Sequence, residues 1–328
     1  MDARTDQLQY EVDPGWEQLP PGFAHGDVVG LGVDSRDRVF VFTRREPRVI
    51  LYNRDGSFDS SWGEGLFTSR THGLTVAPDD TVYCVDEGRQ VVYHFTADGT
   101  LLQTIGTPDA ASDTGYDGSS LESITHGGPP FNRPTNLAVA PSGDLYVSDG
   151  YGNARVHRFD AGGRLLQSWG EPGVGQGEFN LVHGIAVAED GRVLVADREN
   201  DRVQVFTADG RYLDEWTNVQ RPTNLAIDGA GRVYVSELWR PAGDRSLRLG
   251  VNVENLPGQV SVRDQQGEVL ARWGGPDLTA AGSFVAPHDV CVDSHGDVVV
   301  GEVTWTFGVQ PGRVPEGTHT LQRFRRVG

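Results

Sequence analysis

The sequence predicts an all-β fold, a six-bladed β-propeller whose last blade is completed by the N-terminal strand. Three observations predict it. Gly (43) and Pro (18) are frequent among the 328 residues while hydrophobic residues make up 37%, which suits short strands and tight turns. One strand pattern recurs six times at a spacing of about 40 residues. The sixth copy lacks its fourth strand, and a strand-like segment at 8–16 can supply it, closing the ring and removing exposed sheet edges.

Each copy contains an apolar strand, a turn with Gly, a second strand such as VYVSD, a third strand ending near Phe, and a short strand ending at Trp or Gly. In the fourth copy it reads HGIAVAEDGRVLVADRENDRVQVFTADGRYLDEWT. A β-sandwich is disfavoured because the unit is too regular. The predicted blades, within a single domain over 1–328, cover 28–63, 72–106, 135–170, 183–217, 223–274 and 288–327 together with 8–16.

Loop lengths indicate which face of the ring handles ligands. The connections between strands 1 and 2 and between strands 3 and 4 are tight, as in APDD, PSGD and TADG. The long insertions at 107–132, 240–257 and 306–319 all belong to the opposite face. Long loops on one end of a rigid scaffold are typical of binding and catalytic sites, so we expect the site on that face.

The types of charged residue and their balance exclude several classes of chemistry and of partner. The net charge is −18, and all 28 basic residues are Arg. Without Lys there can be no Schiff base, no covalent pyridoxal phosphate anchor and no P-loop lysine. The excess of acid, with no basic block, argues against nucleic acid and anionic membranes as partners.

Two cysteines, Cys84 and Cys291, lie too far apart to form a metal knuckle, and two do not make a disulfide framework. The N-terminal segment has no apolar leader, and no 18-residue apolar run exists. These features predict a cytoplasmic protein without a membrane partner.

Histidine recurs at one register position. At the start of strand 1 the six copies carry Val29, His72, Thr135, His183, Thr223 and His288, so that only alternate blades carry His. Strand 1 is the innermost strand of a propeller blade, and alternate blades of a six-fold ring place the three imidazoles around the axis. Three imidazoles with an open fourth position are the arrangement typical of catalytic Zn²⁺. The other six histidines share no register and are expected in loops or at the surface: His25, His94, His126, His157, His295 and His319.

The repeats resemble NHL repeats. Over nearly the whole chain the sequence also resembles peptidyl-α-hydroxyglycine α-amidating lyase, with its strongest local matches in the segments THGL, DGYGNARV, VHGIAV, VADRENDRVQVF and APHDV. The disulfide positions of the animal enzymes fall at Gly152 and Leu194, so those bridges are missing here. This departure fits an intracellular setting.

The resemblance implies a set of site residues. Zinc is implied at His72, His183 and His288, with Tyr151 as the catalytic base and with Arg44 and Arg198 in the substrate pocket. It also implies a structural calcium held by Asp289 and by the backbone carbonyls of Leu31 and Leu74.

The repeat pattern by itself places Arg44, Tyr151 and Arg198 after second strands, on the long-loop face. Each has a plainer interpretation: an Arg at a blade corner often pairs with a carboxylate, Tyr151 could cap a Gly-rich turn, and Asp289 could line the channel. The repeated Asp86, Asp149 and Asp197 are interpreted as structural hydrogen-bonding residues.

These residues suit the cleavage of an α-hydroxyglycine into an amide and glyoxylate. A metal with an open site acidifies the substrate hydroxyl. Tyr151 and Arg44 are the predicted catalytic residues, Tyr151 as acid or base, and the Arg44 and Arg198 guanidinium groups suit a substrate carboxylate. The predicted substrate is a peptide or small metabolite with an anionic group. Two alternatives stay open, a non-catalytic NHL binding platform and a metal-dependent propeller hydrolase or lactonase.

Overall fold

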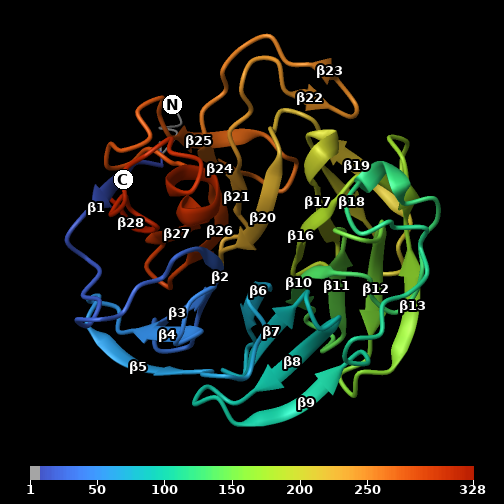
Figure 1. Cartoon of the computed structure of the whole chain (residues 1–328), viewed down its shortest axis with the longest axis horizontal. Helices are drawn as coiled ribbons and strands as arrows, with labels where there is room; N and C mark the ends of the chain where they lie inside the picture. The colour runs from blue at the N-terminus through green and yellow to red at the C-terminus, as the bar shows by residue number, and fades with distance from the viewer. Residues whose placement is uncertain (1–7) are drawn as a thin grey trace, which may run out of the picture.

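The computed structural model describes residues 8–328 and contains six four-stranded antiparallel sheets arranged as blades around a central axis (Figure 1). The blades follow one another around the ring in chain order. The predicted six-bladed β-propeller is confirmed.

Each blade runs from an inner first strand to an outer fourth strand. Blade 1 contains β2 (Val28–Val33), β3 (Val39–Thr43), β4 (Val49–Tyr52) and β5 (Phe58–Trp62). Blade 2 contains β6 (Thr71–Val76), β7 (Val82–Asp86), β8 (Val91–Phe95) and β9 (Leu101–Ile105). Blade 3 contains β10 (Pro134–Val139), β11 (Leu145–Asp149), β12 (Arg155–Phe159) and β13 (Leu165–Trp169). Blade 4 contains β16 (Val182–Val187), β17 (Val193–Asp197), β18 (Arg202–Phe206) and β19 (Tyr212–Trp216). Blade 5 contains β20 (Pro222–Ile227), β21 (Val233–Glu237), β24 (Gln259–Arg263) and β25 (Val269–Trp273).

Blade 6 contains β26 (Pro287–Val292), β27 (Val298–Glu302), β28 (Leu321–Arg326) and, as its outer strand, β1 (Tyr10–Asp13). β1 pairs antiparallel with β28, with Tyr10 opposite Arg326 and Asp13 opposite Arg323. The N-terminal strand therefore closes the last blade, as the missing strand of the sixth copy predicts. The prediction that the N-terminal segment is not an apolar leader concerns residues 1–7 in part, and these lie outside the described residues.

The remaining short elements lie in connections. They are the strand pairs β14 (Glu171–Pro172) with β15 (Glu178–Phe179) and β22 (Arg245–Ser246) with β23 (Gly250–Val251), the 3-10 turns η1 (Leu121–Ser123) and η2 (Arg198–Asn200), and the π-helical turn η3 (Trp305–Val309). Among the residues that the structure describes, no helix has the length and apolar character needed to cross a membrane.

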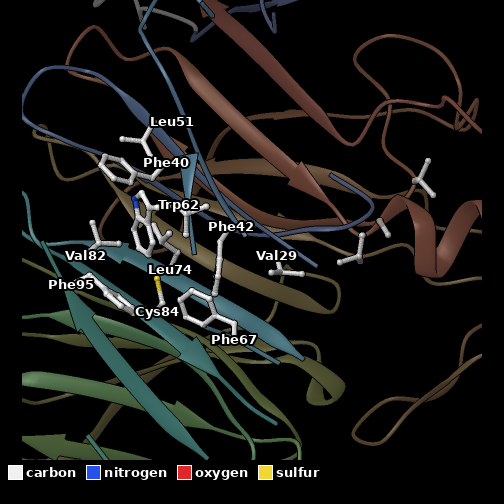
Figure 2. Packing of buried hydrophobic residues seen from close by; sticks show 14 of the residues in the cluster. Val29, Phe40, Phe42, Leu51, Trp62, Phe67, Leu74, Val82, Cys84 and Phe95 are labelled. Carbon is white, nitrogen blue, oxygen red and sulfur yellow. The ribbon is translucent and has the colours of Figure 1, made fainter. Parts of the chain in front are cut away.

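Apolar side chains between neighbouring blades form the core. Between blades 1 and 2, Phe42, Trp62, Phe67 and Phe95 pack around Cys84, as Figure 2 shows. Both cysteines are buried free thiols.

The Trp at a blade end packs over a Gly in the next blade. Trp62 covers Gly99, Trp169 covers Gly210 and Trp216 covers Gly267; a Cβ built on any of these glycines would come within 3 Å of the indole ring. Each of these glycines also has a positive φ. The repeated Trp is therefore a packing residue between blades.

In five of the six blades the second strand ends in a buried carboxylate. This carboxylate accepts a hydrogen bond from the connection that precedes the blade. In blades 2 to 4, Asp86 accepts a hydrogen bond from the Thr68 amide, Asp149 from that of Asn132 and Asp197 from that of Asn180. In blades 5 and 6, Glu237 accepts from the Gln220 amide and Glu302 from the Val285 amide. The interpretation of the repeated Asp as structural residues agrees with these contacts, because each one fixes a loop that leads into strand 1.

Candidate metal centre and its pocket

A backbone irregularity brings the three histidines to the axis. In every blade the register between strands 1 and 2 shifts at the same place, between Val182 and Gly184 in blade 4 and between Pro287 and Asp289 in blade 6. His72, His183 and His288 each occupy this bulged position. A bulge re-aims a side chain relative to the sheet, and neighbouring first strands contact one another around the ring. The three imidazoles therefore converge.

The three rings form a nearly equilateral triangle. Their centroids are separated by 4.7 Å (His72 to His183), 4.7 Å (His72 to His288) and 4.8 Å (His183 to His288). One nitrogen from each ring lies within 4.8 Å of the other two, and all three side chains are buried. Within residues 8–328 no other cluster of His, Cys, Asp or Glu offers such a set of metal ligands.

Each imidazole is oriented by a backbone carbonyl of the next blade. The Nδ1 atom of His72 lies 2.6 Å from the Thr135 carbonyl oxygen, that of His183 lies 2.8 Å from the Thr223 oxygen, and that of His288 lies 3.0 Å from the Val29 oxygen. A carbonyl only accepts, so Nδ1 carries the proton and donates it in each pair. Each Nε2 is then unprotonated and carries the lone pair that a metal would use, and a bond of this type at Nδ1 is typical of metal-binding histidines.

The environment keeps the trio neutral. Burial, followed by the charges of Arg44 and Arg198, lowers the pKa of His288 to about 3. Burial likewise holds the pKa of His72 and His183 well below the ordinary value, with the neighbouring imidazoles and arginines adding to the effect. Neutral imidazoles are the form that binds metal.

Tyr151 contacts two of the three histidines. Its hydroxyl oxygen is 3.2 Å from Nε2 of both His72 and His183, and Nη1 of Arg198 lies 3.4 Å from it. The Arg133 guanidinium lies over the Tyr151 ring, 5.0 Å from its centroid. The structure therefore brings Tyr151 together with the histidines rather than leaving it as an isolated turn residue.

Arg44 and Arg198 lie in the same pocket, and each also pairs with a carboxylate. Nη1 of Arg44 is 3.3 Å from Asp27, and Nε of Arg198 is 2.8 Å from Glu199. Both arginines therefore form the ion pairs that the plainer interpretation predicts, and both also line the pocket.

A pocket of about 180 Å³ reaches the trio at His288. Its lining contains four arginines, one glutamate and a group of apolar or hydroxyl side chains beside Tyr151 and His288: Arg44, Arg70, Arg133, Arg198, Glu87, Leu238, Val303, Thr306 and Phe307. The sequence reasoning missed Arg70, Glu87 and Arg133. Arg70 and Arg133 each stand two residues before a register position, which is the signal that could have found them.

Asp289 is buried at the inner end of blade 6. Its carboxylate accepts hydrogen bonds from the amides of Leu31 (2.9 Å) and Val290 (2.7 Å) and contacts the Asn224 side-chain amide. Burial raises its pKa to about 7. Leu31 and Leu74 line a cavity of about 270 Å³ along the channel, as does Asn224, whose Oδ1 is buried without a hydrogen-bond partner.

The expectation that the other histidines lie at the surface or in loops is wrong for His157; His25 lies in the loop before β2, although it is buried there. His157 is fully buried in β12, 2.7 Å from the Ser168 hydroxyl and 3.3 Å from Asp149, and His25 is buried between Thr320 and Tyr52. Polar partners make both positions tolerable for imidazole, and those of His157 come from the neighbouring strands of its own blade.

Comparison with known proteins agrees with the sequence resemblance. Residues 131–159 and 179–206 match the NHL repeat. NHL repeat-containing protein 3 of Homo sapiens is 32% identical over 248 residues, covering 71% of this chain and 67% of that protein. Peptidyl-alpha-hydroxyglycine alpha-amidating lyase 1 of Drosophila melanogaster is 30% identical over 276 residues, covering 78% of this chain but only 46% of that protein. The predicted resemblance to both groups is confirmed, although the chain spans less than half of the lyase relative.

Among solved structures, virginiamycin B lyase from Staphylococcus aureus superposes with a TM-score of 0.59 at 12% identity, covering 97% of this chain and 100% of that one. A gluconolactonase from Xanthomonas campestris gives a TM-score of 0.57 at 15% identity, covering 92% and 86%. At these identities the likeness concerns the fold alone.

Proposed function

This chain belongs to the NHL-repeat β-propeller family, and from that premise we propose that it is a zinc-dependent lyase that cleaves the C–N bond of an α-hydroxyglycine-type substrate. The products are an amide and glyoxylate. The similarity to amidating lyases supports the reaction class. The observation that carries the proposal is the triangle of His72, His183 and His288, each donating through Nδ1 and presenting Nε2 inward.

The donor set fits zinc. Three neutral imidazoles without a protein carboxylate or thiolate match the three-ligand sites at which zinc keeps a position for substrate. Hard oxygen-seeking cations such as Mg²⁺ and Ca²⁺ are disfavoured by an all-nitrogen set. Zinc bound there would act as a Lewis acid and acidify the substrate hydroxyl.

The side chains around the trio have complementary roles. The substrate carboxylate is received by Arg44 and Arg198, whose guanidinium groups line the pocket and suit paired hydrogen bonds. In its ionised form Tyr151 would take the proton of the substrate hydroxyl as the carbonyl of glyoxylate forms, and this proton would pass to the amide nitrogen as the C–N bond breaks; its contacts with His72 and His183 support this role. No electron transfer is involved, so the reaction needs no redox cofactor.

A structural calcium forms a separate part of the proposal. The Asp289 carboxylate has no cationic partner among the described residues, and the orphaned Asn224 Oδ1 lies beside it on the channel. Leu31 and Leu74 line the same cavity, and their carbonyls would complete an oxygen set of the kind calcium prefers.

Metal analysis together with a glyoxylate-release assay tests the proposal. We expect about one zinc per chain at the trio and glyoxylate release from an N-acyl-α-hydroxyglycine. His183→Ala should lose both, whereas His94→Ala, a half-buried histidine outside the pocket, should lose neither. Zinc content unaffected by His183→Ala would overturn the metal site.

The assay also separates the alternatives. Zinc without glyoxylate release would keep the metal site and reject the lyase reaction. If the protein binds no zinc and turns over no substrate, a binding platform is favoured. If it hydrolyses lactones, and this activity depends on Asp289 rather than on the histidines, a lactonase is favoured.

A further inference from the structure

The charges lining the pocket exceed what a single substrate carboxylate requires. Arg44 pairs with Asp27, and Arg198 pairs with Glu199, which also binds Arg221 and Arg240; neither carboxylate is part of the pocket lining. Within the lining, Arg70 and Arg133 share one carboxylate, that of Glu87. Arg70, Arg133 and an ionised Glu87 therefore have a net charge of +1, although the whole chain has a net charge of −18.

Arg133 is held rigidly. Its Nε and Nη2 atoms donate to Glu87 at 3.2 and 3.0 Å, and its Nη1 donates to the Tyr116 hydroxyl at 2.8 Å. Its backbone amide donates to the Gln90 side chain, and its φ of +64° is in the left-handed region. Because these contacts occupy three of its nitrogens, Arg133 is a fixed charge whose position depends on the blade 2 to blade 3 insertion.

Arg70 has both of its terminal nitrogens available as donors. Its Nε donates to Glu87 at 3.0 Å, which orients the guanidinium, while neither terminal nitrogen has a hydrogen-bond partner among the described residues. Half of its side chain is exposed, in contrast to the buried Glu87, so it lies at the mouth of the pocket. A guanidinium pinned at Nε presents its two terminal nitrogens as a fork that suits a carboxylate.

We propose that Arg70, oriented by Glu87 and reinforced by the charge of Arg133, binds a second anionic group on the acyl side of the substrate. The preferred substrate is then a compact acidic N-acyl-α-hydroxyglycine with a carboxylate at each end. This assignment of substrate class rests on the proposed function. The pocket of about 180 Å³ supports a compact molecule, because sites for drug-sized ligands span roughly 300–1,000 Å³.

Binding is measured first, without turnover. The probes are N-acylglycines that lack the hydroxyl: malonyl-, succinyl- and glutarylglycine, each compared by calorimetry with a neutral analogue of the same chain length. We expect at least one acidic probe to bind about 10-fold or more tightly than its neutral analogue, with a preference that falls as salt rises. No preference at any chain length would overturn the proposal.

Variants then assign the preference. Arg70→Gln should reduce the ratio of acidic to neutral affinity to about 2-fold or less, and Arg70→Lys should give an intermediate ratio, because it keeps the charge and loses the fork. Arg89→Gln removes the same charge from a partly exposed arginine in the neighbouring turn and should keep the wild-type ratio. Equal weakening of both probes by Arg70→Gln would contradict a second anion site.

Turnover completes the test. With the corresponding α-hydroxyglycines, the acidic substrate should show about 10-fold higher kcat/KM than its neutral analogue. Glyoxylate release with equal kcat/KM would reject the acidic substrate class and leave the lyase reaction standing. Tighter binding of acidic probes without any glyoxylate release would reject the lyase reaction and leave the anion site standing.

Discussion

The Nδ1 atom of His183 donates to the carbonyl oxygen of Thr223, 2.8 Å away in the neighbouring blade. Thr223 occupies in blade 5 the register position that His183 occupies in blade 4. The same relation holds from blade 2 to blade 3 and from blade 6 to blade 1. Each histidine blade is thus followed by a blade whose backbone orients the imidazole, so the alternation both spaces the three rings and sets their tautomers.

The neutral state of the trio predicts a pH-dependent stability of the metal-free protein. The pKa of His288 is about 3 in the folded chain, against about 6.5 in the unfolded chain. Below pH 6.5 the unfolded state therefore binds a proton that the folded state does not, and stability falls with pH until about pH 3. Between pH 7.5 and 5.5 the free energy of unfolding of chelator-treated wild type should fall by about 1.4 kcal/mol relative to His288→Gln. Denaturant titrations at both pH values measure this difference, and a constant difference would contradict a buried neutral His288.

Tyr151→Phe should lower kcat by about 10²- to 10⁴-fold, because it removes the hydroxyl next to His72 and His183 that we propose transfers the proton. The zinc content should stay unchanged. Tyr146→Phe removes a hydroxyl that donates to the Ala208 carbonyl, outside the pocket, and should keep the wild-type rate. Loss of zinc in Tyr151→Phe would mean that the residue holds the site together rather than serving the reaction.

Calcium should stabilise the chain through Asp289. At a concentration about 100 times its dissociation constant, a ligand of the folded state adds about 2.7 kcal/mol to the free energy of unfolding. We therefore expect Ca²⁺ to raise the Tm of chelator-treated wild type and to leave Asp289→Asn unaffected, with Mg²⁺ as the comparison ion. An equal rise in both proteins would place the calcium elsewhere.

Asp197→Ala should destabilise the fold by about 3–5 kcal/mol. Its carboxylate accepts from the Asn180 amide and from the side chains of Asn200 and Arg202, all within 2.8 Å, and Arg202 is itself buried. Asp190→Ala, which breaks a surface pair with Arg192, should change stability by less than about 1 kcal/mol. Equilibrium denaturation compares the two variants, and similar costs would show that burial of the Asp197 network is unimportant.

The repeat pattern was sufficient for the fold. Strand alternation, tight turns with Gly and the missing fourth strand of the last copy are local features that leave one closed arrangement, and the pairing of β1 with β28 follows from it. The register of His72, His183 and His288 was equally readable, because ring symmetry turns equal positions in alternate repeats into neighbours at the axis. By contrast, the contact of the buried His157 with Asp149 was harder to recognise, because the equivalent third-strand position carries a residue type other than His in each of the next three blades: Gln204, Ser261 and Gln322.

What the sequence by itself determined is the six-bladed ring and the alternation of three histidines at one register, since both depend on periodicity. Only the tertiary structure decided which carbonyl orients each imidazole and that Arg70, Glu87 and Arg133 join the pocket. The physical reason is that hydrogen bonds and ion pairs such as that between Arg133 and Glu87 link residues 46 positions apart. Their distance and burial are set by how the loops of neighbouring blades pack, which no local pattern encodes.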